Sequence, residues 1–152
     1  MDKIVFITGA SSGIGAGCAR KFASQGASLI LNARNVNKLS ALKEELEKQY
    51  GAKIYLLPFD VRDRKAATSA LESLPKEWQS IDILVNNAGL VIGTDKEQEG
   101  SLDEWDIVID TNIKALLAMT RLIVPGMVER KRGHIINLSL IHISEPTRPI
   151  SI

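Results

Sequence analysis

The sequence predicts an α/β fold in which short buried strands alternate with amphipathic helices. Runs of apolar and β-branched residues indicate five strands, at residues 3–7, 27–33, 53–59, 81–85 and 133–137. Apolar residues at helical spacing occupy the segments between these strands. A glycine-rich turn, residues 8–15, joins the first strand to the first helix. Together these observations predict one parallel, doubly wound sheet of the Rossmann kind, built from repeated βαβ units.

The first two helices are marked by apolar stripes and by residues that suit their ends. After the turn, Ile14, Cys18 and Phe22 recur at helical spacing, and Gly26 ends the pattern. Asn35 is placed to cap the N-terminus of the second helix. The stripe that this helix is expected to bury consists of Leu39, Leu42 and Leu46.

Three further signals place the remaining helices. Pro75 limits a short helix whose apolar positions begin at Ala66. Ser101, with Glu104 three residues later, has the capping-box spacing and predicts the start of another helix. We expect Pro125 to kink or break that helix late. Its buried stripe is expected to contain Trp105, Val108, Ile109, Ile113 and Leu116.

Composition bounds the kinds of partner that the chain can have. Its 152 residues suit one domain at most, and 19 basic against 18 acidic residues leave a net charge of +1. This balance argues against a nucleic acid or an acidic membrane surface as partner. The single cysteine, Cys18, rules out an internal disulfide and suits a reducing compartment. With no signal peptide before the first strand, we expect a cytoplasmic protein.

The glycine-rich turn is the first candidate for a binding site. A turn between a buried strand and a helix N-terminus presents free backbone N–H groups, and the helix dipole adds positive potential that can hold a pyrophosphate. Gly9 permits a tight turn, while Gly13 and Gly15 allow close approach of ligand and strand. The alternative is a tight connection that binds nothing. The candidate residues are Thr8, Gly9, Ser11, Ser12, Gly13, Ile14 and Gly15.

Polar residues at the ends of the second and third strands suggest which dinucleotide would bind. An acidic residue after the second strand would bind a ribose 2′-hydroxyl and select NAD, but Arg34 lies there instead. Arg34 suits the 2′-phosphate of NADP, and the neighbouring glycine turn favours that role over the alternative of a solvated arginine at a strand end. Asp60, after the third strand, could accept a hydrogen bond from adenine, cap the next helix, or do both.

Two further sets of residues lie where chemistry is expected. Asn86, Ala88 and Gly89 follow the fourth strand, where small residues and amides suit a flat cofactor, although they could form only a turn. Asn112 falls on an apolar helical stripe, where an unpaired amide would cost about 1–3 kcal/mol. Position alone leaves a structural role for Asn112 as open as a catalytic one.

Together these motifs resemble the short-chain dehydrogenase/reductase family. The resemblance is carried by the glycine turn, Asp60-Val61, the Asn-Asn-Ala-Gly run, Asn112 and residues 133–137. Within that family, residues 74–78, 81–85 and 125–130 are similar to the NADP-dependent 3-hydroxy acid dehydrogenases, which act on serine or allo-threonine. The resemblance implies NADP as cofactor and hydride transfer to or from a hydroxyl-bearing carbon. It also implies Val61 as a cofactor contact, Asn112 in a proton relay, and a catalytic Ser and Tyr-x-x-x-Lys.

The chain departs from that pattern after Asn137. No Tyr follows Tyr55 and no Lys follows Lys131, and Leu140 stands where the catalytic Ser is expected. Residues 138–152 resemble the translation of a sequencing-library adapter, so we expect a non-native, disordered tail after an NADP-binding domain at 1–137. The sheet is then incomplete after the fifth strand.

Two kinds of function remain open on this evidence. The favoured one is the cofactor-binding part of a dehydrogenase acting on a small hydroxy acid, itself inactive. The alternative is a non-catalytic NADP-binding, redox-sensing module. We expect the full-length form to be a homo-oligomer, dimer or tetramer, through the helix that carries Asn112. In the incomplete sheet, Ile4, Phe6, Leu84, Ile135 and Ile136 should lose part of their cover.

Overall fold

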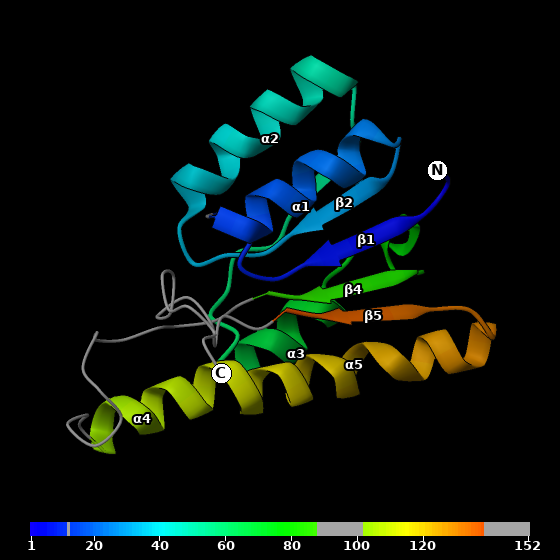
Figure 1. The fold of residues 1–152 in the computed structure, drawn as a ribbon. Helices are drawn as coiled ribbons and strands as arrows, with labels where there is room; N and C mark the ends of the chain where they lie inside the picture. The colour runs from blue at the N-terminus through cyan, green and yellow to red at the C-terminus, as the bar shows by residue number, and fades with distance from the viewer. Residues whose placement is uncertain (12, 88–101, 139–152) are drawn as a thin grey trace, which may run out of the picture.

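The computed structural model describes residues 1–11, 13–87 and 102–138. Strands and helices alternate as the sequence predicts (Figure 1). The strands are β1 (Ile4–Ile7), β2 (Ser28–Leu31), β3 (Ile54–Leu56), β4 (Ile83–Asn86) and β5 (His134–Asn137). The α-helices are α1 (Gly13–Ser24), α2 (Val36–Tyr50), α3 (Arg64–Glu72), α4 (Leu102–Ile109) and α5 (Ala115–Arg130). A short 3₁₀ helix, η1 (Lys76–Trp78), precedes β4, and a π-helical turn, η3 (Asp110–Lys114), joins α4 to α5.

The strands form one parallel sheet in the order β3-β2-β1-β4-β5. The chain moves outward from β1 to β3 and then crosses to β4 on the other side of β1. The carboxyl ends of β1 and β4 therefore lie side by side at the point where strand order reverses. Doubly wound sheets bind their ligands at such a switch point. The parallel pairing and the strand order confirm the fold predicted from the sequence.

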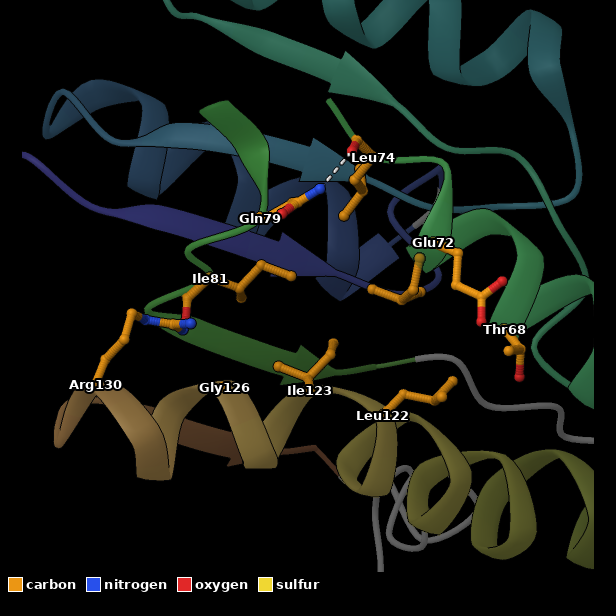
Figure 2. A pocket seen from close by; sticks show the side chains of 10 residues that line it. Thr68, Glu72, Leu74, Gln79, Ile81, Leu122, Ile123, Gly126 and Arg130 are labelled. Atoms are coloured by element: carbon orange, nitrogen blue, oxygen red, sulfur yellow. Dashed lines mark hydrogen bonds between the residues drawn. The ribbon is translucent and has the colours of Figure 1, made fainter. Parts of the chain in front are cut away.

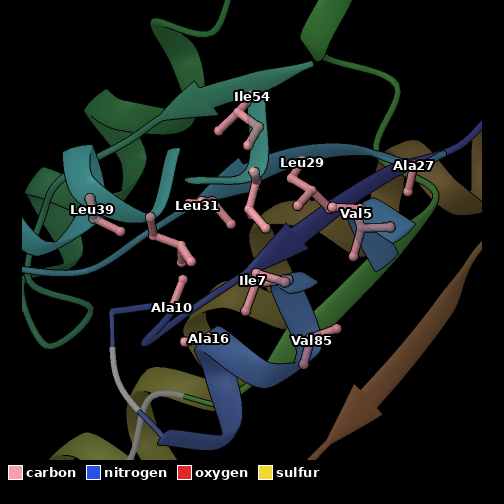
Figure 3. Close-up of a cluster of buried hydrophobic side chains, with 14 of the residues drawn as sticks. Val5, Ile7, Ala10, Ala16, Ala27, Leu29, Leu31, Leu39, Ile54 and Val85 are labelled. Atoms are coloured by element: carbon pink, nitrogen blue, oxygen red, sulfur yellow. The ribbon is translucent and has the colours of Figure 1, made fainter. Parts of the chain in front are cut away.

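Each face of the sheet is covered by its own helices, with α1 and α2 on one face and α3 and α5 on the other (Figure 1). Val5 and Ile7 pack against α1 and α2 (Figure 3), while Phe6 packs on the opposite face. Since the two faces alternate along β1 and both are buried, the strand is a continuous apolar run. Within the described residues, no helix is long and apolar enough to cross a bilayer.

The expected loss of cover is found only in part. Phe6 and Leu84 have no exposed surface because α3 and α5 cover them, so that expectation was wrong for these two residues. Ile135 and Ile136 in β5 are half-buried, as expected for a strand at the edge of the sheet.

Helix ends follow local sequence signals, with one exception. Asn35 caps α2, its side chain accepting a hydrogen bond from the Lys38 N–H at 3.1 Å. The cap of α3 is Asp63, which accepts from the Ala66 N–H at 3.1 Å. Asp60, which the sequence left open as this cap, lies three residues too early for that role. The stripe Leu39, Leu42, Leu46 is buried as predicted.

The long helical region after residue 102 differs from the sequence prediction in two ways. Pro125 lies inside α5 without breaking it. A departure from α-helical geometry occurs earlier, at η3, the turn that carries Asn112. Of the stripe that was expected to be buried, Ile109 and Ile113 are 43% and 54% exposed. The π-helical turn adds one residue to the helix, so regular helical spacing does not locate the buried face correctly beyond it.

Asp82 ties the amino ends of the strands together. Its carboxylate accepts hydrogen bonds from the Ile4 N–H at 2.9 Å and from Arg132 Nε at 2.6 Å. The Asp82 side chain is only 7% exposed, whereas that of Arg132 is 55% exposed. Burial raises the pKa of Asp82, but the hydrogen bonds from Arg132 and Ile4 outweigh it and hold the pKa below its ordinary value.

Replacing this carboxylate should destabilise the fold at neutral pH. Asp82→Asn is expected to lower the free energy of unfolding by about 1–3 kcal/mol at pH 7. A depressed carboxyl pKa stabilises the fold above the unfolded-state pKa, and that stability is lost as the pH falls through the folded value. The difference between parent and variant should therefore shrink below about pH 4 in urea unfolding. Glu77→Gln, an exposed control, should show no such difference, and a deficit that persists in acid would contradict this account.

Candidate functional site

The glycine turn forms a tight, open connection at the start of α1. Gly9 and Gly13 have φ angles of 60° and 49°, in the left-handed region that favours glycine. A Cβ on Gly13 would meet nothing within 4 Å. Ile14, in the first turn of α1, is 50% exposed although it belongs to the helix's apolar series. At the carboxyl edge of the sheet, the turn therefore has open space beside Gly13, next to the exposed Ile14 side chain and the N-terminus of α1.

Two residues fasten this turn to the neighbouring strand. The Thr8 N–H donates to the Val85 carbonyl at 3.1 Å, and Thr8 Oγ1 accepts from the Asn87 N–H at 2.9 Å. Asn87 Nδ2 donates to the Gly9 carbonyl at 3.0 Å. Asn87 was not among the site residues predicted from the sequence. Its contact lies 78 residues away along the chain, and the only available signal was its position after a buried strand.

Gly15 packs into the space enclosed by these contacts. A Cβ at this position would collide with the Gly9 carbonyl oxygen and with Asn87 Nδ2. The Gly9 oxygen is a backbone atom of the turn, and moving the Asn87 side chain away would break the hydrogen bond between the two residues. The third glycine of the motif is thus required by packing between helix and strand, while the first two are required by backbone conformation.

The ends of β2 and β3 form the second part of the site. Buried Asn32 donates through Nδ2 to the Leu57 and Phe59 carbonyls at 3.1 and 3.0 Å, which joins these two strand ends. Arg34 is exposed and forms no ion pair within the described part of the chain. The position that would select between a 2′-hydroxyl and a 2′-phosphate thus carries an accessible cation.

Asp60 lies beside this cation and has a partner of its own. Its carboxylate accepts from the Arg62 N–H at 2.9 Å and from the Arg62 guanidinium at 2.9–3.3 Å. The hydrogen bond from Arg62 is the main reason that the pKa of Asp60 lies below its ordinary value, and the charge of Arg34 lowers it further. Val61 is buried directly after Asp60.

Asn86 lies on the opposite face of the sheet from the glycine turn. Its Nδ2 donates to Thr120 Oγ1 at 3.3 Å and to Asn137 Oδ1 at 3.0 Å, and its side chain is buried. These contacts join β4, β5 and α5. The side chain of Asn86 therefore has a structural role, and its predicted contact with a cofactor remains a prediction.

Asn112 lies within the π-helical turn and is half-buried. Turns of this kind are frequent at functional sites because they place one extra residue in the helix.

Ser12, Ala88, Gly89 and Ser101, with the tail after Leu138, lie outside the described residues. The described residues contain no group of three His, Cys, Asp or Glu side chains that could hold a metal ion.

A separate cavity of about 260 Å³ is lined by residues of α3 and α5 and by Leu74, Gln79 and Ile81 from the segment between α3 and β4 (Figure 2). Its lining includes Leu74 and Ile81, which precede β4, and Arg130 near the end of α5. It therefore opens near the amino ends of the strands, away from the glycine turn.

The fold and the glycine turn agree with the resemblance to the short-chain dehydrogenase/reductase family. The family model described as short chain dehydrogenase matches residues 3–147. The chain belongs to this family.

Particular relatives narrow the comparison. The chain is 47% identical over 135 residues to the NADP-dependent 3-hydroxy acid dehydrogenase YdfG of Escherichia coli K12, covering 89% of this chain and 53% of that protein. It is 41% identical to sulfoacetaldehyde reductase 2 of Chromohalobacter salexigens, covering 93% and 56%. The solved serine dehydrogenase of Escherichia coli superposes with a TM-score of 0.84 at 46% identity, covering 94% and 64%. The chain thus spans about half the length of the curated relatives that it matches.

The packing of Gly15 gives a direct test of the site's geometry. Gly15→Ala should lower the free energy of unfolding by about 1–3 kcal/mol, because the added methyl group overpacks the fastened turn. Gly17 provides a matched control in the same helix, since a Cβ there would meet nothing within 4 Å. Gly17→Ala should raise stability by up to about 1 kcal/mol. Equal effects of the two substitutions in urea unfolding would contradict the assigned packing.

Proposed function

We propose that this chain is the cofactor-binding part of an NADP-dependent oxidoreductase. The full-length protein would interconvert a hydroxyl-bearing carbon and a carbonyl on a small 3-hydroxy acid such as serine or allo-threonine. The observation that carries this proposal is the open turn at the N-terminus of α1 beside accessible Arg34, with no carboxylate at the end of β2. NADP dependence and action on 3-hydroxy acids or serine are stated in the names of the relatives.

The residues present fit an NADP molecule. Backbone N–H groups of Gly13 to Gly15 would hold the pyrophosphate, since the first amides of a helix lack intrahelical acceptors. Arg34 would bind the 2′-phosphate, and Asp60 with Val61 would border the adenine. Exposed Ile14 would offer an apolar surface to the flat ring system. When bound, the nicotinamide would supply or accept the hydride.

Of the residues that the family resemblance implies for proton transfer, this chain contains Asn112 but not the Tyr and Lys. Asn112, in its π-helical turn, would order a water molecule for proton transfer. The Tyr and Lys that the family resemblance implies have no counterpart after Asn137, because no Tyr follows Tyr55 and no Lys follows Lys131.

We also propose that the full-length protein associates with copies of itself through the helix that carries Asn112. Ile109, Ile113 and Leu117 are 43%, 54% and 60% exposed along this helical region. Such a row of outward apolar side chains favours burial against another surface. A second copy would supply that surface.

Binding of 2′-phosphorylated nucleotides tests the cofactor assignment. Arg34→Ala should weaken binding of adenosine 2′,5′-bisphosphate by about ten- to a hundredfold, because it removes a charge-assisted contact. Binding of adenosine 5′-monophosphate should be nearly unchanged. Titration calorimetry gives both constants, and Lys48→Ala controls for loss of one positive charge at the far end of α2. Equal weakening of both nucleotides would show that Arg34 does not recognise the 2′-phosphate.

A second measurement tests whether the chain is inactive without the Tyr and Lys of the acid–base pair. The purified 152-residue chain should form no NADPH when given NADP⁺ and serine, allo-threonine or other 3-hydroxy acids. Positioning by the cofactor site alone cannot replace the absent acid–base pair. NADPH formation that depends on the hydroxy acid would contradict the proposal.

A further inference from the structure

The ion pair between Asp60 and Arg62 places a second arginine beside the proposed 2′-phosphate position. Arg62 contacts both carboxylate oxygens, through Nε at 3.2 and 3.3 Å and through a terminal nitrogen at 2.9 Å. The backbone N–H of the same residue adds a fourth contact at 2.9 Å. Both side chains are about a third exposed, at 35% for Arg62 and 32% for Asp60. Arg62 thus makes four contacts with the two oxygens of the Asp60 carboxylate.

Arg34 lies close to the same carboxylate, because Asn32, two residues before Arg34, donates to the carbonyl of Phe59, the residue before Asp60, at 3.0 Å. The charge of Arg34 favours the ionised form of Asp60, yet the two groups form no ion pair. Counted by themselves, the side chains of Arg34, Asp60 and Arg62 carry two positive charges and one negative charge. Without the charge of Arg62, the charges of Arg34 and Asp60 would cancel, and no arginine would oppose the attraction of the Asp60 carboxylate for Arg34.

The Asp60 carboxylate would therefore affect the binding of a phosphate dianion to Arg34 differently with and without Arg62. An unpaired carboxylate would repel the phosphate and compete with it for the Arg34 guanidinium. A carboxylate already held by Arg62 would do much less of either.

We propose that Arg62 is a specificity-determining positioning residue, which neutralises Asp60 and so keeps Arg34 available for the 2′-phosphate of the cofactor. This inference rests on the proposed function, because it concerns the same nucleotide site. Arg62 acts through Asp60 and not by direct contact with the nucleotide. Its effect should therefore depend on the carboxylate.

The test is a comparison of binding ratios in the full chain. For each variant, titration calorimetry gives the affinity for adenosine 2′,5′-bisphosphate divided by that for adenosine 5′-monophosphate. Arg62→Gln should reduce this ratio about five- to tenfold, which is the effect of one unit charge about 4 Å away when water screens it. Arg62→Lys should preserve most of the ratio, because it retains the charge. Arg64→Gln, which removes an equal charge from the first residue of α3, should change the ratio by less than about twofold.

A double variant separates neutralisation from a merely structural role. Asp60→Asn combined with Arg62→Gln should restore the ratio to near the parent value, even if both affinities fall through loss of an adenine contact. A loop damaged by loss of Arg62 would lower both affinities together and would not be rescued by Asp60→Asn. An unchanged ratio in Arg62→Gln, or no recovery in the double variant, would overturn the inference while leaving the NADP assignment standing. A parent protein with no preference for the 2′-phosphorylated nucleotide would overturn both.

Discussion

The carboxyl ends of β1 and β4 are joined by hydrogen bonds that leave no room for a side chain on Gly15. Thr8 accepts from the backbone of Asn87, and the amide of Asn87 donates to the Gly9 carbonyl at 3.0 Å. This closure fixes the direction in which α1 leaves the sheet. The N-terminus of α1 therefore opens at the switch point between β1 and β4, where the rest of the proposed nucleotide site is assembled.

The proposed binding surface is divided by chemistry along the edge of the sheet. The end of β1 offers backbone donors, while the ends of β2 and β3, which Asn32 holds together, offer charged side chains. Such a division suits a dinucleotide, whose pyrophosphate needs N–H groups and whose adenosine half carries the distinguishing phosphate. At the amino edge of the sheet, the role is structural: the ion pair between Asp82 and Arg132 stabilises the fold.

Much of this arrangement could be predicted from the sequence because it depends on local signals. The glycine turn, the cap at Asn35 and the alternation of strands and helices each depend on residues close together in the chain. The role of Asn87 could not be predicted, since its partner lies 78 residues away and either of two adjacent asparagines could have made the contact. The π-helical turn was missed because apolar spacing does not distinguish one extra residue in a helix from a shift of its buried face.

The central claim, that the N-terminus of α1 is the anion-binding element, can be tested by amide hydrogen exchange. In the free protein the amides of Gly13, Ile14 and Gly15 should exchange quickly, because the first residues of a helix lack intrahelical acceptors. The buried Thr8 amide, bonded to the Val85 carbonyl, should already exchange slowly. Saturating NADP⁺ should slow exchange at the three helix amides and leave Thr8 unchanged. Binding of NADP⁺ without new protection at Gly13 to Gly15 would contradict the account.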